Sequence, residues 1–471
     1  MQYTLGIDLG TSGAKAALMD TRGFTLVSLA MREYDNAAQQ PSAMLWDAVS
    51  EAVREAVAGF DPRDIRGIGL SAQMHGAALY DASGAVIEPI INWKDKRCDA
   101  PLAKYGGCTT IEEVTRRMAG LDLNDLGVDK LASGYLGMTL FHLMENEPAI
   151  FERVRHAVFP GDFIRGQLLG HPDYATDPTN AFGAGIFNAR LGAWHDEVIQ
   201  RLGLPRSILP VVHPSTQIAG AVPAGVARKL GLADGTPVVF GGGDNQVSLL
   251  GNGLVSQNSP ALINIGTAAQ ISQVAASYAK LPGIDTRNFF EGQFAFVGPS
   301  FGGGHNFAAL RLALQKREGR AISYAEMNEA ASRVAPGADG LVYHIATRRQ
   351  PNRPDGFEGR LDLTDIGHQS RAVMEGVLLD LRQMRPAASA GGAGFLAGSG
   401  KGLQNSAVWA QMAADMFGQP IKITNFENAV WGAAVLAALG VGLISNAQEA
   451  TSAICYTQEF APNPALVERY R

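Results

Sequence analysis

An acidic residue near the start of the sequence directly follows an apolar run and precedes a turn that suits phosphate. Asp8 closes the run 3–8, and residues 10–13 read GTSG. Such a turn offers backbone N–H groups and hydroxyls to phosphate oxygens, and the acid can bind Mg²⁺ through water. It is not the phosphate loop that wraps a helix N-terminus, because residues 400–402 read GKG where that motif needs Ser or Thr after Lys. An ordinary hairpin turn holding Asp and Gly is the alternative interpretation.

A second acid follows a glycine-rich strand end at residues 240–246 (FGGGDNQ). The apolar run 237–240 predicts a strand, and three glycines leave room for a substrate to approach Asp244. A carboxylate in this place can accept the proton of an attacking hydroxyl. The alternative is a glycine-rich turn in which Asp244 caps a helix over 246–250.

A third cluster combines an amide, an imidazole, an acid and an aromatic ring. Residues 71–76 (SAQMHG) end an apolar strand, and residues 93–97 (WKDKR) follow some twenty positions later. Such groups bind a polyol through hydrogen bonds to its hydroxyls and a flat apolar wall against its C–H groups. A lone His in an α/β protein is more often structural, and this interpretation stays open for His75.

Residues 392–397 match the spacing of a dinucleotide-binding fingerprint, as Gly392-x-Gly394-x-x-Ala397. That fingerprint should follow a strand, whereas here residues 395–397 are themselves the predicted strand. We therefore expect no nicotinamide cofactor. The Gly-Ser-Gly turn at 398–400 instead suits an adenine or ribose lying across the backbone.

These residues need strand ends to position them, and the first part of the sequence supplies an α/β pattern. Apolar runs separated by turn residues predict strands, and apolar residues at helical spacing predict a helix. The expected elements are strands at 3–8, 14–19 and 24–30, a turn at 20–23, a helix at 42–59 and a strand at 66–71.

The first element has a second copy past mid-chain, since residues 7–12 (IDLGTS) resemble residues 263–268 (INIGTA). The sequence therefore predicts an α/β fold of two related domains. We expect the boundary near 247–258, giving domains 1–250 and 251–471. The last third also alternates, with strands at 394–397 and 421–424 and helices at 405–417 and 429–439.

Composition bounds the function. The chain has 471 residues, 46% hydrophobic and 18% charged, with 55 Gly and a net charge of −6. This balance indicates neither a nucleic-acid partner nor a membrane surface. The apolar stretch 430–444 is too short to span a bilayer, so we interpret it as a buried helix. The start of the chain lacks a signal-peptide pattern, and three Cys without metal-type spacing suggest reduced thiols. We expect a cytoplasmic protein.

Together these motifs resemble the FGGY family of carbohydrate kinases, in the same order along nearly the whole chain. The first phosphate motif corresponds to residues 8–12, and the sugar-contact motifs of the xylulokinase and sedoheptulokinase branches to 73–76, Trp93 and Asp95. Further matches are 243–246 (the catalytic Asp), 265–267 (a second phosphate motif), 397–400 (the adenosine motif) and 371–376 (the C-terminal signature). Two segments depart from the family pattern: 133–148 lacks an expected Lys, and 347–351 reads TRRQP.

The resemblance implies two actin-like (ribonuclease H-like) ATPase domains with a cleft between them. The N-terminal domain would bind sugar, the C-terminal one ATP, and Mg²⁺ would assist. By resemblance Asp244 is the catalytic base, and Asp8 and Asp244 are the metal ligands. The ATP- and phosphate-binding residues would be Gly10, Thr11, Ser12, Lys15, Gly266, Thr267, Gly398, Ser399, Gly400 and Asn405. The sugar-binding residues would be Gln73, Met74, His75, Trp93, Asp95, Asp244 and Asn245.

The expected activity is ATP-dependent phosphorylation of the terminal hydroxyl of a ketose, sedoheptulose or xylulose in type. Kinases for ribulose, glycerol or gluconate are alternatives. A non-enzymatic actin-like ATPase would not need the sugar cluster, and a regulator with degenerate catalysis would not need both Asp8 and Asp244. A homodimer is compatible with the sequence.

Overall fold

The computed structural model describes residues 1–346, 355–385, 394–424 and 428–470, which form two compact units. Unit 1 comprises residues 1–251, 286–294 and the described residues of 427–453. Unit 2 comprises the described residues within 252–285, 295–426 and 454–471. The division expected after residue 250 lies beside the first junction, and two later segments belong to unit 1.

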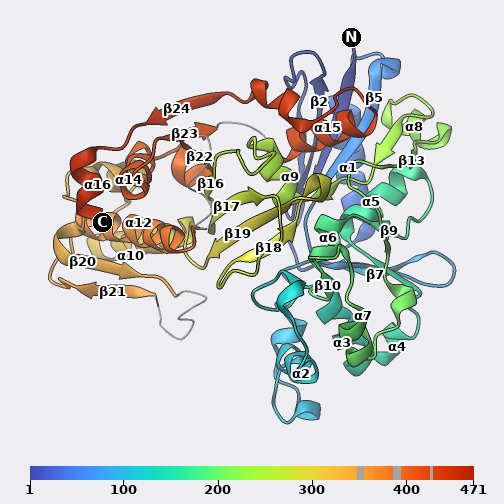
Figure 1. Cartoon of the computed structure of the whole chain (residues 1–471), viewed down its shortest axis with the longest axis horizontal. Coiled ribbons are helices and arrows are strands. Elements are labelled where there is room, and N and C mark those ends of the chain that lie inside the picture. Colours follow the sequence, from blue (N-terminus) through green and yellow to red (C-terminus); the bar gives the residue numbers. More distant parts are fainter. Residues whose placement is uncertain (347–354, 386–393, 425–427, 471) are drawn as a thin grey trace. The chain divides into compact units, whose positions relative to one another are not determined.

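Unit 1 alternates strands and helices (Figure 1). Its strands are β1 Tyr3–Leu9, β2 Gly13–Asp20, β3 Ala30–Glu33, β4 Gln39–Gln40, β5 Ile65–Ala72, β6 Ala77–Tyr80, β7 Val86–Ile91, β8 His156–Val158, β9 Ala175–Thr176, β10 Phe187–Asn188, β11 Ala193–Trp194, β12 Val211–Val212, β13 Ile218–Ala221, β14 Pro237–Val239, β15 Gly242–Gly243 and, largely, β18 Asp285–Asn288. Its helices are α1 Ser42–Ala56, α2 Thr110–Arg117, α3 Leu136–Asn146, α4 Pro148–Phe151, α5 Pro160–Leu169, α6 Pro178–Phe182, α7 Asp196–Leu202, α8 Ala224–Leu230, α9 Asp244–Gly251 and α15 Asn428–Gly440.

Unit 2 has the same kind of alternation over fewer elements. Its strands are β16 Leu262–Ile265, β17 Ala269–Ala275, β19 Phe294–Ser300, β20 Leu341–His344, β21 Gly356–Gly359, β22 Leu396–Ser399, β23 Ile421–Thr424 and β24 Tyr456–Phe460. Its helices are α10 Gly304–Glu318, α11 Tyr324–Ser332, α12 Ile366–Gln383, α13 Lys401–Gln404, α14 Ala407–Phe417 and α16 Pro464–Tyr470.

The main sheet of unit 1 has the strand order β13-β14-β5-β1-β2-β3, with β15 also paired to β5. β1 runs parallel to β5 and antiparallel to β2, so Asp8 is level with Ser71 on one side and Lys15 on the other. The predicted strands at 3–8, 14–19 and 66–71 and the helix beginning at residue 42 are confirmed. Apolar runs therefore located these elements to within a few residues.

The strand predicted at 24–30 is wrong, because the third strand begins only at Ala30. Over residues 24–29 the chain makes a single bridge, between Met19 and Leu26. The N–H of Leu18 donates to the hydroxyl of Ser28 at 3.2 Å. A side-chain oxygen thus takes a bond that a strand backbone would accept, which is how Ser competes with regular structure.

Helix α15 packs closely on the centre of this sheet, and Figure 1 shows it beside the first strands of the chain. A Cβ on Gly6 would lie 1.9 Å from the carbonyl oxygen of Val430, and one on Gly69 would lie 1.9 Å from that of Ala433. Only glycine allows this approach. The apolar stretch beginning at residue 430 is therefore a buried helix, as predicted, and it covers β1 and β5.

The sheet of unit 2 repeats the arrangement of unit 1, with the order β19-β17-β16-β22-β23-β24. β16 is antiparallel to β17 and parallel to β22, as β1 is to β2 and β5. The similarity between residues 7–12 and 263–268 therefore reflects two related hairpins. The helix predicted from residue 405 begins at Ala407, because the hydroxyl of Ser406 caps it by accepting from the N–H of Trp409.

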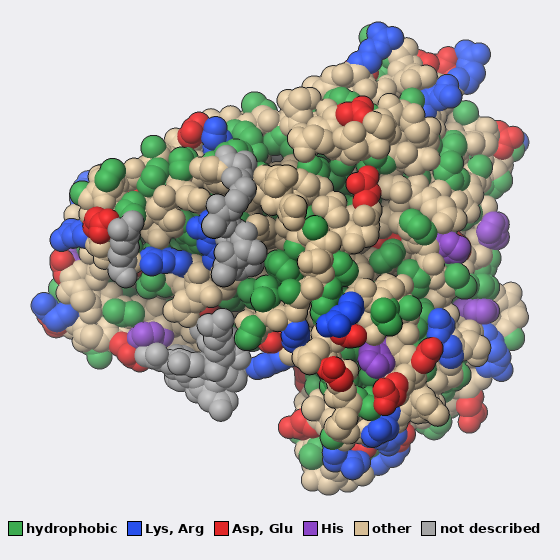
Figure 2. All heavy atoms as spheres, viewed as in Figure 1, with side chains coloured by type: hydrophobic (Ala, Val, Ile, Leu, Met, Phe, Trp, Pro, Cys, Tyr) green, Lys and Arg blue, Asp and Glu red, His purple; other side chains and the backbone are tan. Residues whose placement is uncertain are grey.

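On the face in Figure 2, positively and negatively charged side chains are interspersed. None of the helices in the described part of the chain is long and apolar enough to cross a membrane.

Candidate active site

The carboxyl ends of three neighbouring strands of unit 1 bring together the predicted acids. Asp8 lies at the end of β1, and its register partner Ser71 on β5 donates a 2.7 Å hydrogen bond to its carboxylate. β15 pairs with the end of β5 and delivers Asp244 as the first residue of α9. Ligands commonly bind where strands of an α/β sheet end, so this edge is the candidate site.

Asp244 is half-buried, and two backbone N–H groups hydrogen-bond its carboxylate. The N–H of Asn245 donates to it at 2.7 Å, and the N–H of Met74 also hydrogen-bonds it. Burial and the negative charge of Asp8 raise the pKa of Asp244 to about 7, against the opposing effect of Arg287 and of these amides. A carboxylate with a pKa near neutral pH is suited to accept a proton from a hydroxyl.

The glycines before Asp244 have a different role from the one predicted. We expected them to leave space for a substrate, but β5 and Met74 fill that space. A Cβ on Gly241, whose φ is +79°, would lie 2.4 Å from the carbonyl oxygen of Leu70. One on Gly243 would lie 2.6 Å from the Cγ of Met74. The glycines let the chain pass close to β5 and so set the position of Asp244.

The predicted phosphate loop is a tight turn between β1 and β2. The N–H of Gly10 donates to the carbonyl of Gly13 at 2.9 Å, while the side chain of Ser12 is exposed. The amide of Gln40 donates to the carbonyl of Thr11 at 3.0 Å. Lys15, also predicted to bind phosphate, lies on β2 and is partly exposed. The turn is thus fixed while its outer face remains open.

Two of the predicted sugar residues lie beneath the surface and support the loops. Gln73 is fully buried and donates from its amide to the side-chain oxygen of Gln40 at 3.1 Å. Met74 is 4% exposed and backs Gly243. The structure therefore places Gln73 behind the phosphate turn, although we had expected it to face a hydroxyl.

His75 is half-buried at the end of the same segment, in a left-handed conformation with φ +66°. Its Nδ1 lies 2.8 Å from the carbonyl oxygen of Gly183, and its ring stacks on Tyr135 at 4.3 Å between centroids. Because a carbonyl only accepts, Nδ1 carries the proton and Nε2 is the acceptor in the neutral ring. A strained non-glycine residue held so firmly suggests a functional constraint.

Trp93 and Asp95 lie close in sequence but have different partners. Trp93 is 46% exposed, and its indole N–H donates to the Thr11 hydroxyl at 2.8 Å. Asp95 is buried and accepts from the guanidinium of Arg97 at 2.8 Å. Burial acts to raise the pKa of Asp95, but the bonds from Arg97 outweigh it and hold this pKa below its ordinary value.

Unit 2 brings the predicted second phosphate motif and the predicted adenosine motif together. β16 and β22 are neighbours, and the amide of Asn264 donates to the hydroxyl of Ser399 at 2.8 Å. A Cβ on Gly400, whose φ is +84°, would lie 2.5 Å from the carbonyl oxygen of Ile265. Gly266 opens the turn after β16, next to an exposed Thr267, and Gly398 lies within β22 of the same sheet. Asn405 is exposed at the end of α13.

Two segments that we singled out cannot be compared with the structure. Residues 347–351 and Gly392 lie outside the described residues. The rest of the predicted adenosine turn, from Gly394 onward, is described and forms β22 and the turn after it.

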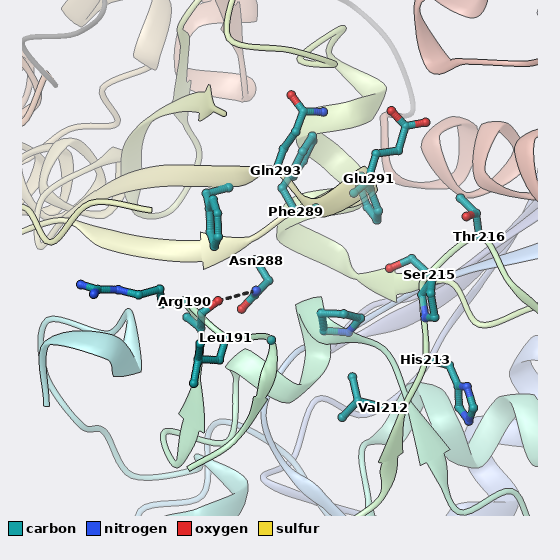
Figure 3. Close-up of a pocket in the computed structure, with 17 residues that line it drawn as sticks. Arg190, Leu191, Val212, His213, Ser215, Thr216, Asn288, Phe289, Glu291 and Gln293 are labelled. Atoms are coloured by element: carbon teal, nitrogen blue, oxygen red, sulfur yellow. Dashed lines mark hydrogen bonds between the residues drawn. The ribbon is translucent and has the colours of Figure 1, made fainter. Parts of the chain in front are cut away.

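A pocket of about 540 Å³ lies in unit 1 (Figure 3). It is lined by the turn between β10 and β11, by residues 212–216 and by residues 288–294. Apolar walls such as Leu191, Val212 and Phe289 surround the amide of Asn288, which donates to the carbonyl of Ala189 at 2.8 Å. The described residues that line it include none of the predicted site residues.

Several side chains that contact or act on the predicted site residues were not predicted. Arg287 acts electrostatically on Asp244, Thr179 hydrogen-bonds Gly243, Gln40 holds Thr11, and Tyr135 stacks on His75. Each comes from a segment distant in sequence. A weak signal existed for Thr179, because the Asp and Pro before it predict a capped helix start.

Asp8 and Asp244 are the two residues that we predicted to hold a divalent cation, and both lie at this edge of the sheet. The charge of Asp8 raises the pKa of Asp244, which shows that the two carboxylates repel each other. The part of the chain that the structure describes has no group of three or more His, Cys, Asp or Glu arranged to hold a metal. Mg²⁺ commonly binds through one or two carboxylates together with water and substrate phosphates, so the chemistry of these two acids fits Mg²⁺.

Comparison with known proteins gives a consistent picture. Two models of the FGGY family of carbohydrate kinases match the sequence, that of the N-terminal domain over residues 3–251 and that of the C-terminal domain over residues 301–441. The xylulose kinase of Lactococcus lactis subsp. lactis (strain IL1403) is 29% identical over 497 aligned positions, covering 100% of this chain and 94% of the relative.

Solved structures agree in fold. The crystal structure of xylulose kinase from Rhodospirillum rubrum has a TM-score of 0.86 and 25% identity, covering 100% of this chain and 96% of that one. The crystal structure of gluconate kinase from Lactobacillus acidophilus has a TM-score of 0.88 and 21% identity, covering 100% of this chain and 95% of that one.

Proposed function

The chain belongs to the FGGY family of carbohydrate kinases, and we propose that it transfers the terminal phosphate of ATP to the terminal hydroxyl of xylulose. The observation that carries the catalytic part is Asp244, a carboxylate whose pKa is raised to about 7 at a strand end. The relatives named xylulose kinase support the choice of a five-carbon ketose.

Asp244 is the proposed base. Phosphoryl transfer has a loose transition state, so an enzyme accelerates it mainly by positioning and by stabilising charge. Asp244 orients the sugar hydroxyl and accepts its proton as the new O–P bond forms. The amides of Met74 and Asn245 fix the carboxylate in place and stabilise its charged form.

The remaining roles are proposed from the chemistry of each unit. Asp8 and Asp244 would hold Mg²⁺, which when bound neutralises charge on the transferring phosphate. In unit 1 the hydroxyl of Thr11 would bind phosphate oxygens. In unit 2 Thr267 lies in the related turn and would do the same, and the turn 398–400 with Asn405 would support the adenosine. His75 would bind a sugar hydroxyl, with Trp93 beside it. Asp95 is buried and bonded to Arg97, so it would support this wall from behind. Closing the site would exclude water, which otherwise competes with the sugar.

The candidate sugars follow from the relatives. Xylulose ranks first because of the relatives, and sedoheptulose is a longer ketose with the same reacting end. Gluconate is the second candidate, supported by the likeness to gluconate kinase from Lactobacillus acidophilus. Free thiols at Cys98, Cys108 and Cys455 agree with a cytoplasmic enzyme, the compartment we expect.

The test is an ADP-release assay with ATP and Mg²⁺ over xylulose, sedoheptulose, ribulose, glycerol and gluconate. We expect the highest kcat/KM with D-xylulose. A clear preference for gluconate would overturn the proposed substrate, and ATP turnover that no sugar stimulates would overturn the reaction. Asp244→Asn serves as the inactive control in every assay.

A further inference from the structure

A buried carboxylate, Asp177, lies beneath the glycine loop that delivers Asp244. Asp177 is fully buried before α6. One of its oxygens accepts from the N–H of Thr179 at 2.8 Å and from the hydroxyl of Thr179 at 2.5 Å. Its other oxygen accepts from the side-chain amide of Asn180 at 2.7 Å. Burying such a charge is costly unless it is hydrogen-bonded. Burial raises the pKa of Asp177, and the hydrogen bonds that it accepts from Thr179, Ser215 and Asn180 oppose this and favour the charged form.

Thr179 connects Asp177 to the glycine loop 241–243 through its hydroxyl. A hydroxyl has one proton, and a carboxylate only accepts, so the proton of Thr179 Oγ1 points to Asp177. The lone pairs of Oγ1 then face the loop, and the N–H of Gly243 donates to them at 2.8 Å. Gly243 immediately precedes Asp244. The position of Thr179 Oγ1 therefore sets the peptide from which Asp244 projects.

Ser215 holds the other end of the same loop. Its hydroxyl donates to Asp177 at 2.9 Å, to the oxygen that Thr179 also uses. Its carbonyl accepts from the N–H of Gly241 at 2.9 Å. Ser215 lines the wall of the pocket in Figure 3. One carboxylate thus ties down residues on both sides of the loop 241–243.

We propose that Asp177 and Thr179 are positioning residues that fix Asp244 for proton transfer, an inference that rests on the proposed role of Asp244 as the base. Neither residue needs to touch substrate. The Thr179 hydroxyl is the acceptor of the Gly243 N–H, so without it this peptide loses its polar anchor on that side. A displacement of about 1 Å can cost about 100-fold in rate.

The test compares Thr179→Val with Thr179→Ser. Val keeps the shape and removes the hydroxyl, whereas Ser retains it. We expect Thr179→Val to lower kcat by about 10- to 100-fold, while KM for xylulose and for ATP changes by less than about threefold, below the 1.4 kcal/mol of a tenfold change. Thr179→Ser should restore most of kcat. Three results would overturn the proposal: a rise in KM with no fall in kcat, an equal kcat in the two variants, or an unchanged kcat in Thr179→Val.

Thr139→Val is the matched control. Thr139 is fully buried in α3, and its hydroxyl has no hydrogen-bond partner within the described part of the chain. It reports what a buried Thr→Val change does by itself to Tm and kcat. If Thr179→Val does not fold, Ser215→Ala removes the other hydroxyl from Asp177 and should lower kcat without raising KM. A wild-type kcat in Ser215→Ala would then overturn the proposal.

Asp244→Asn separates this inference from the proposed function. If Asp244→Asn abolishes turnover while Thr179→Val does not affect it, only the positioning role fails. If Asp244→Asn keeps a near wild-type kcat, the proposed base itself is wrong. The kcat of both variants is measured with the same sugar and at the same Mg²⁺ concentration.

Discussion

The indole N–H of Trp93 donates a 2.8 Å hydrogen bond to the hydroxyl of Thr11. Trp93 was predicted for the sugar and Thr11 for phosphate, so this bond joins two parts of the site that we had treated as separate. The carbonyl of Thr11 is held as well, by Gln40. The turn that would meet phosphate is therefore fixed from two sides by residues far away in sequence.

Trp93→Phe tests this link. It keeps an aromatic wall and removes the N–H, so Thr11 loses a partner worth about 0.5–1.5 kcal/mol. We expect kcat to fall by roughly three- to tenfold, with 1.4 kcal/mol per decade. A double-mutant cycle with Thr11→Val should be non-additive, because both changes remove the same bond. Additive effects would show that the bond has no part in turnover.

The strand ends of the site could be predicted because apolar runs show directly where buried strands stop. Strands at 3–8 and 421–424 and the acid at Asp8 follow from that pattern alone. What a polar side chain meets at a strand end could not be predicted. Gln73 has the polarity of a sugar ligand, but its partner is Gln40, 33 positions away.

Partners distant in sequence explain the other differences. The helix α15 looks like any buried helix, and nothing in its composition says that it covers β1 and β5 of unit 1. The glycines 241–243 indicated a special backbone, yet the reason lies in Leu70 and Met74. Asp177 and Pro178 indicate a helix start at Thr179, but only the fold shows that the Thr179 hydroxyl meets Gly243.

Asp244→Asn should remove most catalysis and leave binding intact. The amide cannot accept the hydroxyl proton, and a lost positioned base costs about 100-fold or more in kcat. Binding of xylulose and of ATP without Mg²⁺, measured separately by calorimetry, should change little because Asn keeps the shape of Asp. A variant with near wild-type kcat would remove Asp244 from the mechanism.

The same variant should change the pH dependence of stability in metal-free protein. The pKa of Asp244 rises from 3.8 to about 7 on folding, so the unfolded chain releases this proton at lower pH than the folded one. This contribution therefore lowers stability as pH rises from about 4 to about 7. Asp244→Asn lacks it, and its Tm relative to wild type should increase across that window. A constant Tm difference from pH 4 to pH 8 would contradict the raised pKa.

His75→Ala tests the sugar site and its support together. Removing a buried partner of a hydroxyl costs about 1–3 kcal/mol, so KM for the ketose should rise by roughly 5- to 150-fold. KM for ATP should barely move. Because the ring also bonds Gly183 and stacks on Tyr135, Tm should fall too. Tyr135→Leu is the matched control, since it removes the stacking and keeps the imidazole.

The last prediction concerns Asp8, which is a proposed metal ligand like Asp244 but is not the proposed base. Asp8→Asn keeps an oxygen to accept the 2.7 Å hydrogen bond from Ser71 and removes only the charge. The Mg²⁺ concentration for half-maximal activity should then rise by about tenfold or more, since losing a charged partner costs about 1.5–3 kcal/mol. KM for the ketose should stay within about twofold, well below the tenfold change that 1.4 kcal/mol would give, because Asp8 lies beside the predicted phosphate turn and is not a proposed sugar ligand. Ser71→Ala removes the hydrogen bond and keeps the charge, so its Mg²⁺ dependence should stay near wild type. If Asp8→Asn and wild type require the same Mg²⁺ concentration, Asp8 does not hold the metal.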